Sequence, residues 1–194
     1  MTQRTVLAIS GNVRSPSRTH ALVAALADAV SARLGSPARV IEVAKEGLPL
    51  LAAPTRAQLS GVGEKLVAEV ESADLLIVGT PVYRASYTGA LKHLFDLVHY
   101  EALAGTPVLL AATGGTRMHG LVTEHQLRPL MGFFGALTVP TTVYAVEEDF
   151  AGYVVSSPAV LERIERAADD AAALLEVARG RRARAGAVPA AAVA

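Results

Sequence analysis

The chain has 194 residues, of which 52% are hydrophobic and 19% are charged, and it carries a formal net charge of zero and no cysteine. This length suits one domain with a full core, and the neutral charge excludes the strong electrostatic attraction that nucleic-acid or membrane-surface binding requires. Without cysteine, neither disulfides nor cysteine metal sites can form. No apolar run reaches the roughly 18 residues of a membrane span, and the start lacks the apolar stretch of a signal peptide, so we expect a cytoplasmic protein.

Short apolar runs alternate along the chain with segments of helical spacing. Most of the runs have strand length and little polar alternation, which is typical of parallel strands covered on both faces. The predicted strands are residues 6–9, 40–43, 75–78, 108–112 and 143–146. The predicted helices are residues 19–34, 63–72, 88–97, 121–137 and 158–178.

Repeated strand–helix alternation predicts an α/β fold of three layers, with a five-stranded parallel sheet between two layers of helices. Right-handed crossovers favour the flavodoxin-like strand order 2-1-3-4-5. We expect residues 1–178 to form this single domain and residues 179–194 to form a disordered tail. Residues 44–60 form a long connection whose structure the pattern does not define.

The first predicted strand runs into the loop SGNVRSPSRT, residues 10–19, which is rich in hydroxyl groups and arginine. In a sheet of this order, ligands bind beyond the carboxyl ends of the strands, beside the first and the third. The small residues expose backbone N–H groups, the start of the next helix favours an anion, and the Arg18 guanidinium suits phosphate oxygens. The loop therefore predicts a phosphate site. The alternative is that Ser17 or Thr19 merely caps the helix.

Two further loops reach the same edge of the predicted sheet. In GTPVYRASYTGALKHLFD, residues 79–96, Pro81 ends the strand, and Tyr83 and Tyr87 offer aromatic faces. In ATGGTRMHG, residues 112–120, the consecutive Gly114 and Gly115 indicate amides exposed to a flat ligand with no side chain in the way. Each loop alone is compatible with an ordinary turn. The three together fit a mononucleotide with a planar ring system, which is FMN.

Missing motifs exclude several other kinds of site. The chain lacks G-x-x-x-x-G-K-[ST], G-x-G-x-x-G and G-x-S-x-G, which argues against ATP hydrolysis, Rossmann-type dinucleotide binding and a serine hydrolase. H-E-x-x-H is also absent, and we predict no metal site. A signalling receiver domain needs an aspartate at the end of the third strand, where this chain has Gly79-Thr80-Pro81.

The segments SPSRT, PVYRASYTGALKHLFDL and LAATGG resemble the NAD(P)H-dependent FMN reductase family. They are most similar to the reductase components of two-component alkanesulfonate or methanesulfonate monooxygenases. The resemblance covers residues 4–175 and implies a flavodoxin-like fold, an enzyme that forms dimers or tetramers, and a flavin handled partly as a substrate.

Carried over position by position, the resemblance implies two sets of flavin-binding residues. The phosphate loop would use Ser10, Ser17, Arg18 and Thr19. The ribityl chain and ring would meet residues of the other two loops, namely Pro81, Val82, Tyr83, Arg84, Thr113, Gly114 and Gly115. The first loop departs from the Gly-Ser-Pro-Arg-type turn of many members, so Arg14 has no assigned role.

The predicted reaction is hydride transfer from NADH or NADPH to FMN, followed by release of reduced FMN to a partner monooxygenase acting on a sulfonate. Because the flavin carries the chemistry, we predict no catalytic side chain. Backbone N–H groups near Gly114 and Gly115 would favour the negative charge of the reduced ring. The alternatives are an FMN-bound quinone or azo-dye reductase, and a flavodoxin that only carries electrons.

The apolar residues of the predicted helix 121–137 spread too widely for a single buried stripe. Burial against another subunit is the simplest cause, and a core helix kinked by proline is the alternative. Pro129 lacks an N–H, so the carbonyl of His125 loses its usual partner, which predicts a kink or a one-residue π-bulge near His125. Some related reductases resemble this, with an inserted residue at the subunit interface beside the flavin. We expect His125 at a contact between dimers of a tetramer, where it would influence flavin release.

Overall fold

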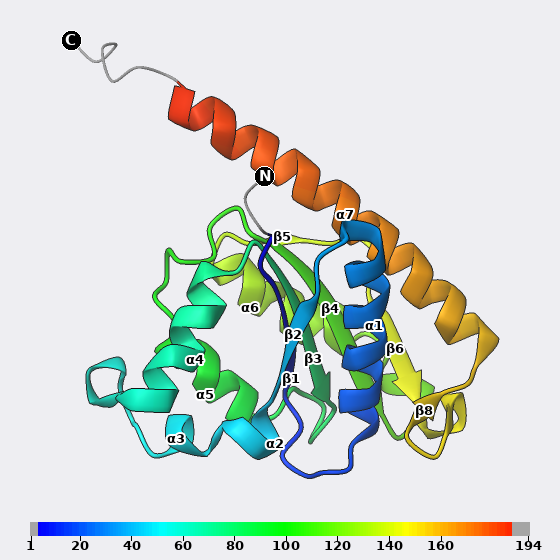
Figure 1. Cartoon of the computed structure of the whole chain (residues 1–194). Helices are drawn as coiled ribbons and strands as arrows, with labels where there is room; N and C mark the ends of the chain where they lie inside the picture. The colour runs from blue at the N-terminus through cyan, green and yellow to red at the C-terminus, as the bar shows by residue number, and fades with distance from the viewer. Residues whose placement is uncertain (1–3, 188–194) are drawn as a thin grey trace.

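The computed structural model describes residues 4–187, which fold around one parallel sheet between two layers of helices (Figure 1). The sheet has the order β2-β1-β3-β4-β5, and β6 also pairs with β4. Its strands are β1 (Val6–Ser10), β2 (Ala38–Glu42), β3 (Leu75–Pro81), β4 (Pro107–Gly114), β5 (Leu137–Thr138) and β6 (Val143–Val146). This confirms the predicted flavodoxin-like α/β architecture and its strand order.

The fifth position of the sheet is divided into β5 and β6, where the sequence predicts one strand over residues 143–146. β5 pairs with Pro107 and Val108 of β4, and β6 pairs further along the same strand, both in parallel. Pro140 lies between the two pieces and has no N–H to donate to a ladder. Leu137, expected in the fourth helix, is therefore a strand residue.

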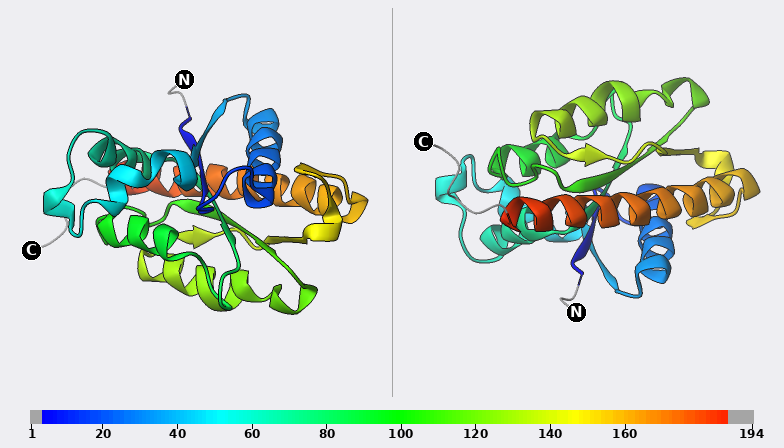
Figure 2. Two further views of the ribbon diagram at one scale, coloured as in Figure 1. Left: turned by 90° about the horizontal axis from the view of Figure 1, so that it is seen from below. Right: turned by 90° about the horizontal axis from the view of Figure 1, so that it is seen from above.

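Helices cover both faces of the sheet, and Figure 2 shows α1 and α6 on opposite sides of the strands. Val6 and Ala8 of β1 belong to the core beneath α1 and α7, whereas Leu7 and Ile9 belong to the core on the other face. Burial on both faces explains why the strands are continuous apolar runs. The five main helices are α1 (Arg18–Leu34) and α7 (Pro158–Ala187) on one face, and α4 (Gly61–Ser72), α5 (Gly89–Leu97) and α6 (Arg128–Phe133) on the other.

Helix α1 has clear signals at both ends. The Ser17 side chain caps it by accepting a hydrogen bond from the His20 N–H at 3.3 Å. Gly35 ends it with a φ of 62°, a left-handed conformation that favours glycine. Leu22 and Leu26 lie fully buried on its inner face. The helix therefore holds the first loop against the sheet at the point where the loop ends.

The connection between β2 and α4 folds into short helices. These are α2 (Val43–Glu46), α3 (Leu48–Leu51) and η1 (Arg56–Gln58). Val43, predicted to end the second strand, instead begins α2, so Glu42 is the last residue of β2. Leu50 is buried, and its carbonyl lies 2.9 Å from His93 Nε2 of α5.

The predicted fourth helix consists of a π-helix followed by an α-helix, after a short turn, η2 (Arg117–His119). The π-helix is η3 (Thr123–Leu127), and the N–H of Arg128 donates to the carbonyl of Thr123, five residues earlier. Of the two predicted alternatives near His125, a kink or a π-bulge, the structure shows the π-type hydrogen bonding, because Pro129 cannot supply the N–H that a regular helix needs there. Helix α6 ends at Phe133 rather than at residue 137, since the chain turns at Gly135 with a φ of 64°.

A turn and a hairpin that the sequence did not predict follow β6. They are η4 (Glu147–Asp149), β7 (Phe150–Ala151) and β8 (Val154–Val155). The buried carboxylate of Asp149 accepts the Val146 N–H at 2.8 Å and an Arg117 hydrogen bond at 3.2 Å. These bonds hold the hairpin at the carboxyl end of β6.

Helix α7 continues to Ala187, so the predicted start of a disordered tail at residue 179 is wrong. Its first part is anchored in the core by Ile164, Ala168 and Leu175. A helix that has already formed extends readily through alanine and arginine, which are both strong helix formers. The rest of the expected tail, residues 188–194, lies outside the described residues. Within residues 4–187, no helix combines the length and the apolar character needed to cross a membrane.

Candidate functional site

The carboxyl ends of β1, β3 and β4 meet at a pocket of about 270 Å³, which we call the three-loop pocket. It lies beside β1 and β3, where ligands bind in a sheet of this order. Nine of the predicted binding residues line it, namely Ser17, Arg18, Thr19, Pro81, Val82, Tyr83, Thr113, Gly114 and Gly115. The fold therefore brings the three predicted loops together in one place.

Hydrogen bonds between the loops join all three of them. The hydroxyls of Thr19 and Thr113 lie 2.6 Å apart and join the first loop to the third. Thr88 Oγ1 donates to the Gly11 carbonyl at 2.7 Å and joins the second loop to the first. The Val82 N–H donates to the Thr113 carbonyl at 2.7 Å and joins the second loop to the third. The walls of the pocket are thus held in place by contacts within the protein.

Two predicted residues, Ser10 and Arg84, do not line the pocket. Ser10 is fully buried, and its Oγ donates to Asn12 Oδ1 at 2.5 Å. Arg84 is exposed with a φ of 52°, in a turn that the backbones of Tyr83 and Ser86 close by hydrogen-bonding to each other. Ser10 therefore supports the first loop from inside, because its hydroxyl is already used there. Arg84 lies at the tip of the second loop, next to the pocket.

A buried carboxylate holds the first loop from the side of β2. Asn12 Nδ2 donates to Glu42 Oε1 and to the Arg14 carbonyl, both at 2.8 Å. Glu42 is 3% exposed, and its Oε2 lies 2.6 Å from Lys45 Nζ. Burial raises the pKa of Glu42, but the hydrogen bonds from Lys45 and Asn12 outweigh burial and lower it below 4.5. Glu42 is therefore charged at neutral pH and keeps Asn12 in place.

Arg18 brings a positive charge to the pocket together with an unused donor. Its Nη2 lies 2.5 Å from Glu147 Oε1, and its guanidinium lies 5.8 Å from the centre of the Tyr153 ring. Its Nε is buried and finds no acceptor among residues 4–187. A buried donor without a partner is unfavourable by about 1 to 3 kcal/mol. An oxygen of a phosphate at the start of α1 would satisfy it.

The two glycines of the third loop differ in their surroundings. A Cβ on Gly114 would lie 2.1 Å from the Tyr144 hydroxyl, so any larger residue there would have to displace the Tyr144 side chain. A Cβ on Gly115 would meet none of the described atoms within 4 Å. A side chain at position 114 would therefore meet Tyr144 first, whereas one at position 115 would enter space that the described residues leave open. Tyr144 is held by its hydroxyl, which donates to the Thr116 carbonyl at 2.6 Å, and burial raises its pKa.

His125 lies exposed on the π-helix η3, beside the second loop. The Ser86 hydroxyl donates to Gln126 Oε1 at 3.1 Å, which links the π-helix to that loop. Arg128 donates to both carboxylate oxygens of Glu124, at 2.5 and 3.0 Å. Hydrogen bonding from Arg128 lowers the pKa of Glu124 below 4.5. The π-helix that carries His125 is thus tied to the second loop and closed by an ion pair, while His125 itself is exposed.

The pocket also contains residues that the sequence did not predict: Pro16, Val146, Glu147, Phe150 and Tyr153. Most of them belong to the end of β6 or to the hairpin that follows it. Because β6 runs parallel to β4, its carboxyl end reaches the same edge of the sheet. Ligands bind beyond the carboxyl ends of parallel strands, and this rule, which selected the other three loops, therefore also applied to Glu147. The hairpin strands have two residues each, which is too short for a recognisable pattern.

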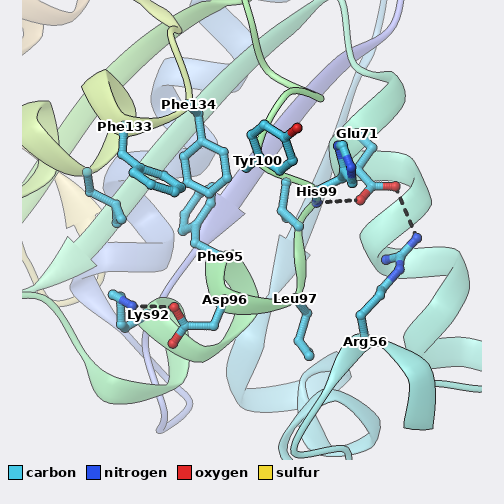
Figure 3. Close-up of a pocket in the computed structure, with 12 residues that line it drawn as sticks. Arg56, Glu71, Lys92, Phe95, Asp96, Leu97, His99, Tyr100, Phe133 and Phe134 are labelled. Atoms are coloured by element: carbon cyan, nitrogen blue, oxygen red, sulfur yellow. Dashed lines mark hydrogen bonds and ion pairs between the residues drawn. The ribbon is translucent and has the colours of Figure 1, made fainter.

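A larger cavity, of about 840 Å³, lies against α5 and α6 (Figure 3). The rings of Phe95, Phe133, Phe134 and Tyr100 gather around it. The ring centres of Phe95 and Phe134 are 5.9 Å apart, and Phe133 is 71% exposed. The cavity is lined by helix residues and by the segment after α5. The hydrogen-bond donors suited to a phosphate, those of Ser17 and Arg18, lie in the three-loop pocket. We therefore assign the chemistry to the smaller pocket.

The chain matches the family model described as NADPH-dependent FMN reductase over residues 4–151. It belongs to this family. It is 50% identical over 169 residues to the FMN reductase (NADPH) of Pseudomonas aeruginosa, covering 87% of this chain and 91% of that protein. It is equally identical, over 169 residues, to the NADH-dependent FMN reductase SfnF of Pseudomonas fluorescens, covering 87% and 90%. Among solved structures, the apo form of the NADH:FMN oxidoreductase EMOB matches with a TM-score of 0.79 and 32% identity, covering 88% of this chain and 89% of that one.

Membership of the family confirms the predicted class of reaction. The chain is an oxidoreductase of the flavin reductase type, with FMN and a reduced nicotinamide nucleotide as its reactants. Some of its relatives are named for NADPH and others for NADH. The similarity is therefore compatible with either nucleotide.

Proposed function

We propose that this flavin reductase takes up FMN in the three-loop pocket, reduces it by hydride transfer from NADH or NADPH, and releases the reduced flavin to a partner monooxygenase. The observation that carries the proposal is the buried Nε of Arg18, which lacks an acceptor within residues 4–187. This donor lies in a pocket built from three loops beside β1 and β3, where ligands bind in a sheet of this order. Membership of the family supports the reaction. The segments that resemble reductases of sulfonate monooxygenases support the partner.

The first loop fits the flavin phosphate. Arg18 offers a charged donor, and the first turn of α1 contains no acidic residue, so the helix dipole and its N–H groups favour an anion. The Ser17 hydroxyl accepts the His20 N–H and still has its own hydrogen to donate. Thr19 is buried and bonded to Thr113, so it positions the loop from below. We assign direct contact with the phosphate to Arg18 and Ser17.

The second and third loops fit the ring and the ribityl chain. Tyr83 offers an aromatic face that is 45% exposed, and Gly115 leaves open space on the other loop. When bound, the flavin accepts the hydride, so the protein has to supply position and electrostatics rather than an acid or a base. N–H groups near Gly114 and Gly115 would stabilise the negative charge that builds up on the reduced ring.

We also propose that a second copy of the chain covers the aromatic surface around Phe133 and Tyr100, which are 71% and 58% exposed. Exposed aromatic side chains beside a large apolar cavity are typical of an interaction surface. Leu121, which begins the segment of residues 121–137 that contains Phe133, is also 62% exposed and supports the same conclusion. His125 would lie at a further contact, between dimers. Size-exclusion chromatography of Phe133→Glu tests the first contact, because a charge there should shift the protein to a smaller species.

One experiment separates the proposed function from its alternatives. The protein is mixed anaerobically with an excess of free FMN and with NADH or NADPH, and the flavin molecules reduced per protein are counted from the loss of flavin absorbance. Many turnovers support a reductase that releases its flavin. A single reduction per protein indicates instead a bound-flavin quinone or azo-dye reductase, or an electron-carrying flavodoxin.

A further inference from the structure

The side chain of Glu147 places a negative charge in the pocket that we assign to a phosphate. Its Oε1 lies 2.5 Å from Arg18 Nη2, and both residues line the three-loop pocket. The pair joins the start of α1 to η4, and its two residues are 129 positions apart in the sequence. The Glu147 side chain is 70% exposed, so neither packing nor burial forces its carboxylate onto Arg18.

A phosphate on Arg18 would meet this carboxylate at close range. Phosphate monoesters carry a charge of about −1.5 to −2 at neutral pH, whereas Arg18 contributes a single positive charge. Arginine binds phosphate best through two parallel N–H donors, and Glu147 already occupies one of the Arg18 donors. The ligand must therefore displace Glu147 or bind beside it, and in either case its affinity falls.

We propose that Glu147 competes with the FMN phosphate for Arg18 and thereby keeps the flavin exchangeable. The inference rests on the proposed function, in which FMN enters and leaves as a substrate. The opposite role, in which Glu147 positions Arg18 for the phosphate, is less compatible with the contacts. Arg18 already lies at the start of α1, with its Nε buried and its guanidinium 5.8 Å from the Tyr153 ring centre. Arg18 therefore has contacts other than Glu147 that hold its guanidinium at the pocket.

The test uses Glu147→Gln, which keeps the size of the side chain and removes its charge. We expect the Kd for FMN to fall by about two- to fivefold, the range for a charge pair near a protein surface. The Kd for riboflavin, which has no phosphate, should stay unchanged, and reduced FMN should dissociate more slowly. The matched control is Glu148→Gln, because Glu148 is an exposed acidic neighbour outside the pocket lining. The gain in FMN affinity from Glu147→Gln should be smaller in the Arg18→Ala background than in the wild-type background, because only the latter contains the guanidinium for which the two anions compete.

Several results would overturn the inference. FMN affinity that is unchanged or weaker in Glu147→Gln would show that the carboxylate is irrelevant or helps to position Arg18. Equal tightening for riboflavin, or equal tightening in Glu148→Gln, would show a general effect of net charge. If wild-type protein binds no FMN, the proposed function fails as well. Normal FMN binding with an unresponsive Glu147→Gln overturns this inference alone.

Discussion

Replacing Arg18 with alanine probes the phosphate site most directly. The variant removes the charge-assisted hydrogen bonds to a phosphate, which contribute about 1.5 to 3 kcal/mol. It also removes the ion pair with Glu147 from the free protein. With side chains 37% and 70% exposed, that pair contributes about 0.2 to 1 kcal/mol. The difference is a loss of about 0.5 to 2.8 kcal/mol in FMN binding, or a rise of about 2- to 110-fold in Kd.

Anaerobic titration followed by flavin fluorescence measures this change, with riboflavin titrated in parallel. Riboflavin should lose little affinity, because it has no phosphate to contact Arg18. Arg14→Ala is the matched control, since Arg14 is exposed in the same loop and does not line the pocket. The phosphate assignment is refuted if FMN and riboflavin lose affinity equally, or if Arg14→Ala weakens FMN binding as much as Arg18→Ala does.

Three further variants test other parts of the site. Gly115→Val should weaken FMN and riboflavin binding alike, by about 1 to 3 kcal/mol from overpacking, with the unfolding temperature unchanged; normal titrations of both flavins would show that this loop does not face the ring. The lowered pKa of Glu42 means that its charge stabilises the fold above pH 4.5 and ceases to do so as pH falls through that lowered value. Glu42→Gln should therefore reduce stability by about 1 to 3 kcal/mol at pH 7, and its difference from wild type in thermal unfolding should shrink in acid; a difference independent of pH contradicts the role given to the charge. Deletion of His125 should leave the fold intact by circular dichroism, change the oligomeric state in size-exclusion chromatography and leave FMN bound after purification. An unchanged oligomeric state and unchanged turnover of FMN would show that this segment serves only packing.

The sheet was predictable because its strands are buried on both faces and so are continuous apolar runs. The π-helix at His125 was predictable for a different reason, since Pro129 removes one specific donor from a helical pattern. The end of the fourth helix was not predictable in the same way. Its apolar residues continue with helical spacing into β5, and only the left-handed turn at Gly135 marks the change.

The site was predictable where it depends on the ends of long strands, and not where it depends on contacts between distant segments. Arg18 could be selected from its loop alone, but its partner Glu147 follows a strand at the far edge of the sheet. The sequence also could not predict why position 114 is a glycine, because the side chain that occupies the space beside it, Tyr144, lies on another strand, β6. Composition and spacing describe what a segment can do by itself, and these contacts depend on the assembled fold.

The hydrogen bonds that join the three loops have a consequence for engineering this enzyme. Thr113 serves two of the junctions, through its hydroxyl to Thr19 and through its carbonyl to the N–H of Val82. A loop transplanted from a relative would bring its own residues without the matching groups on the other two loops. Exchanges that aim to change flavin or nucleotide preference should therefore move all three segments as a set. Chimeras of single loops are expected to lose flavin binding even where each donor loop works well in its own protein.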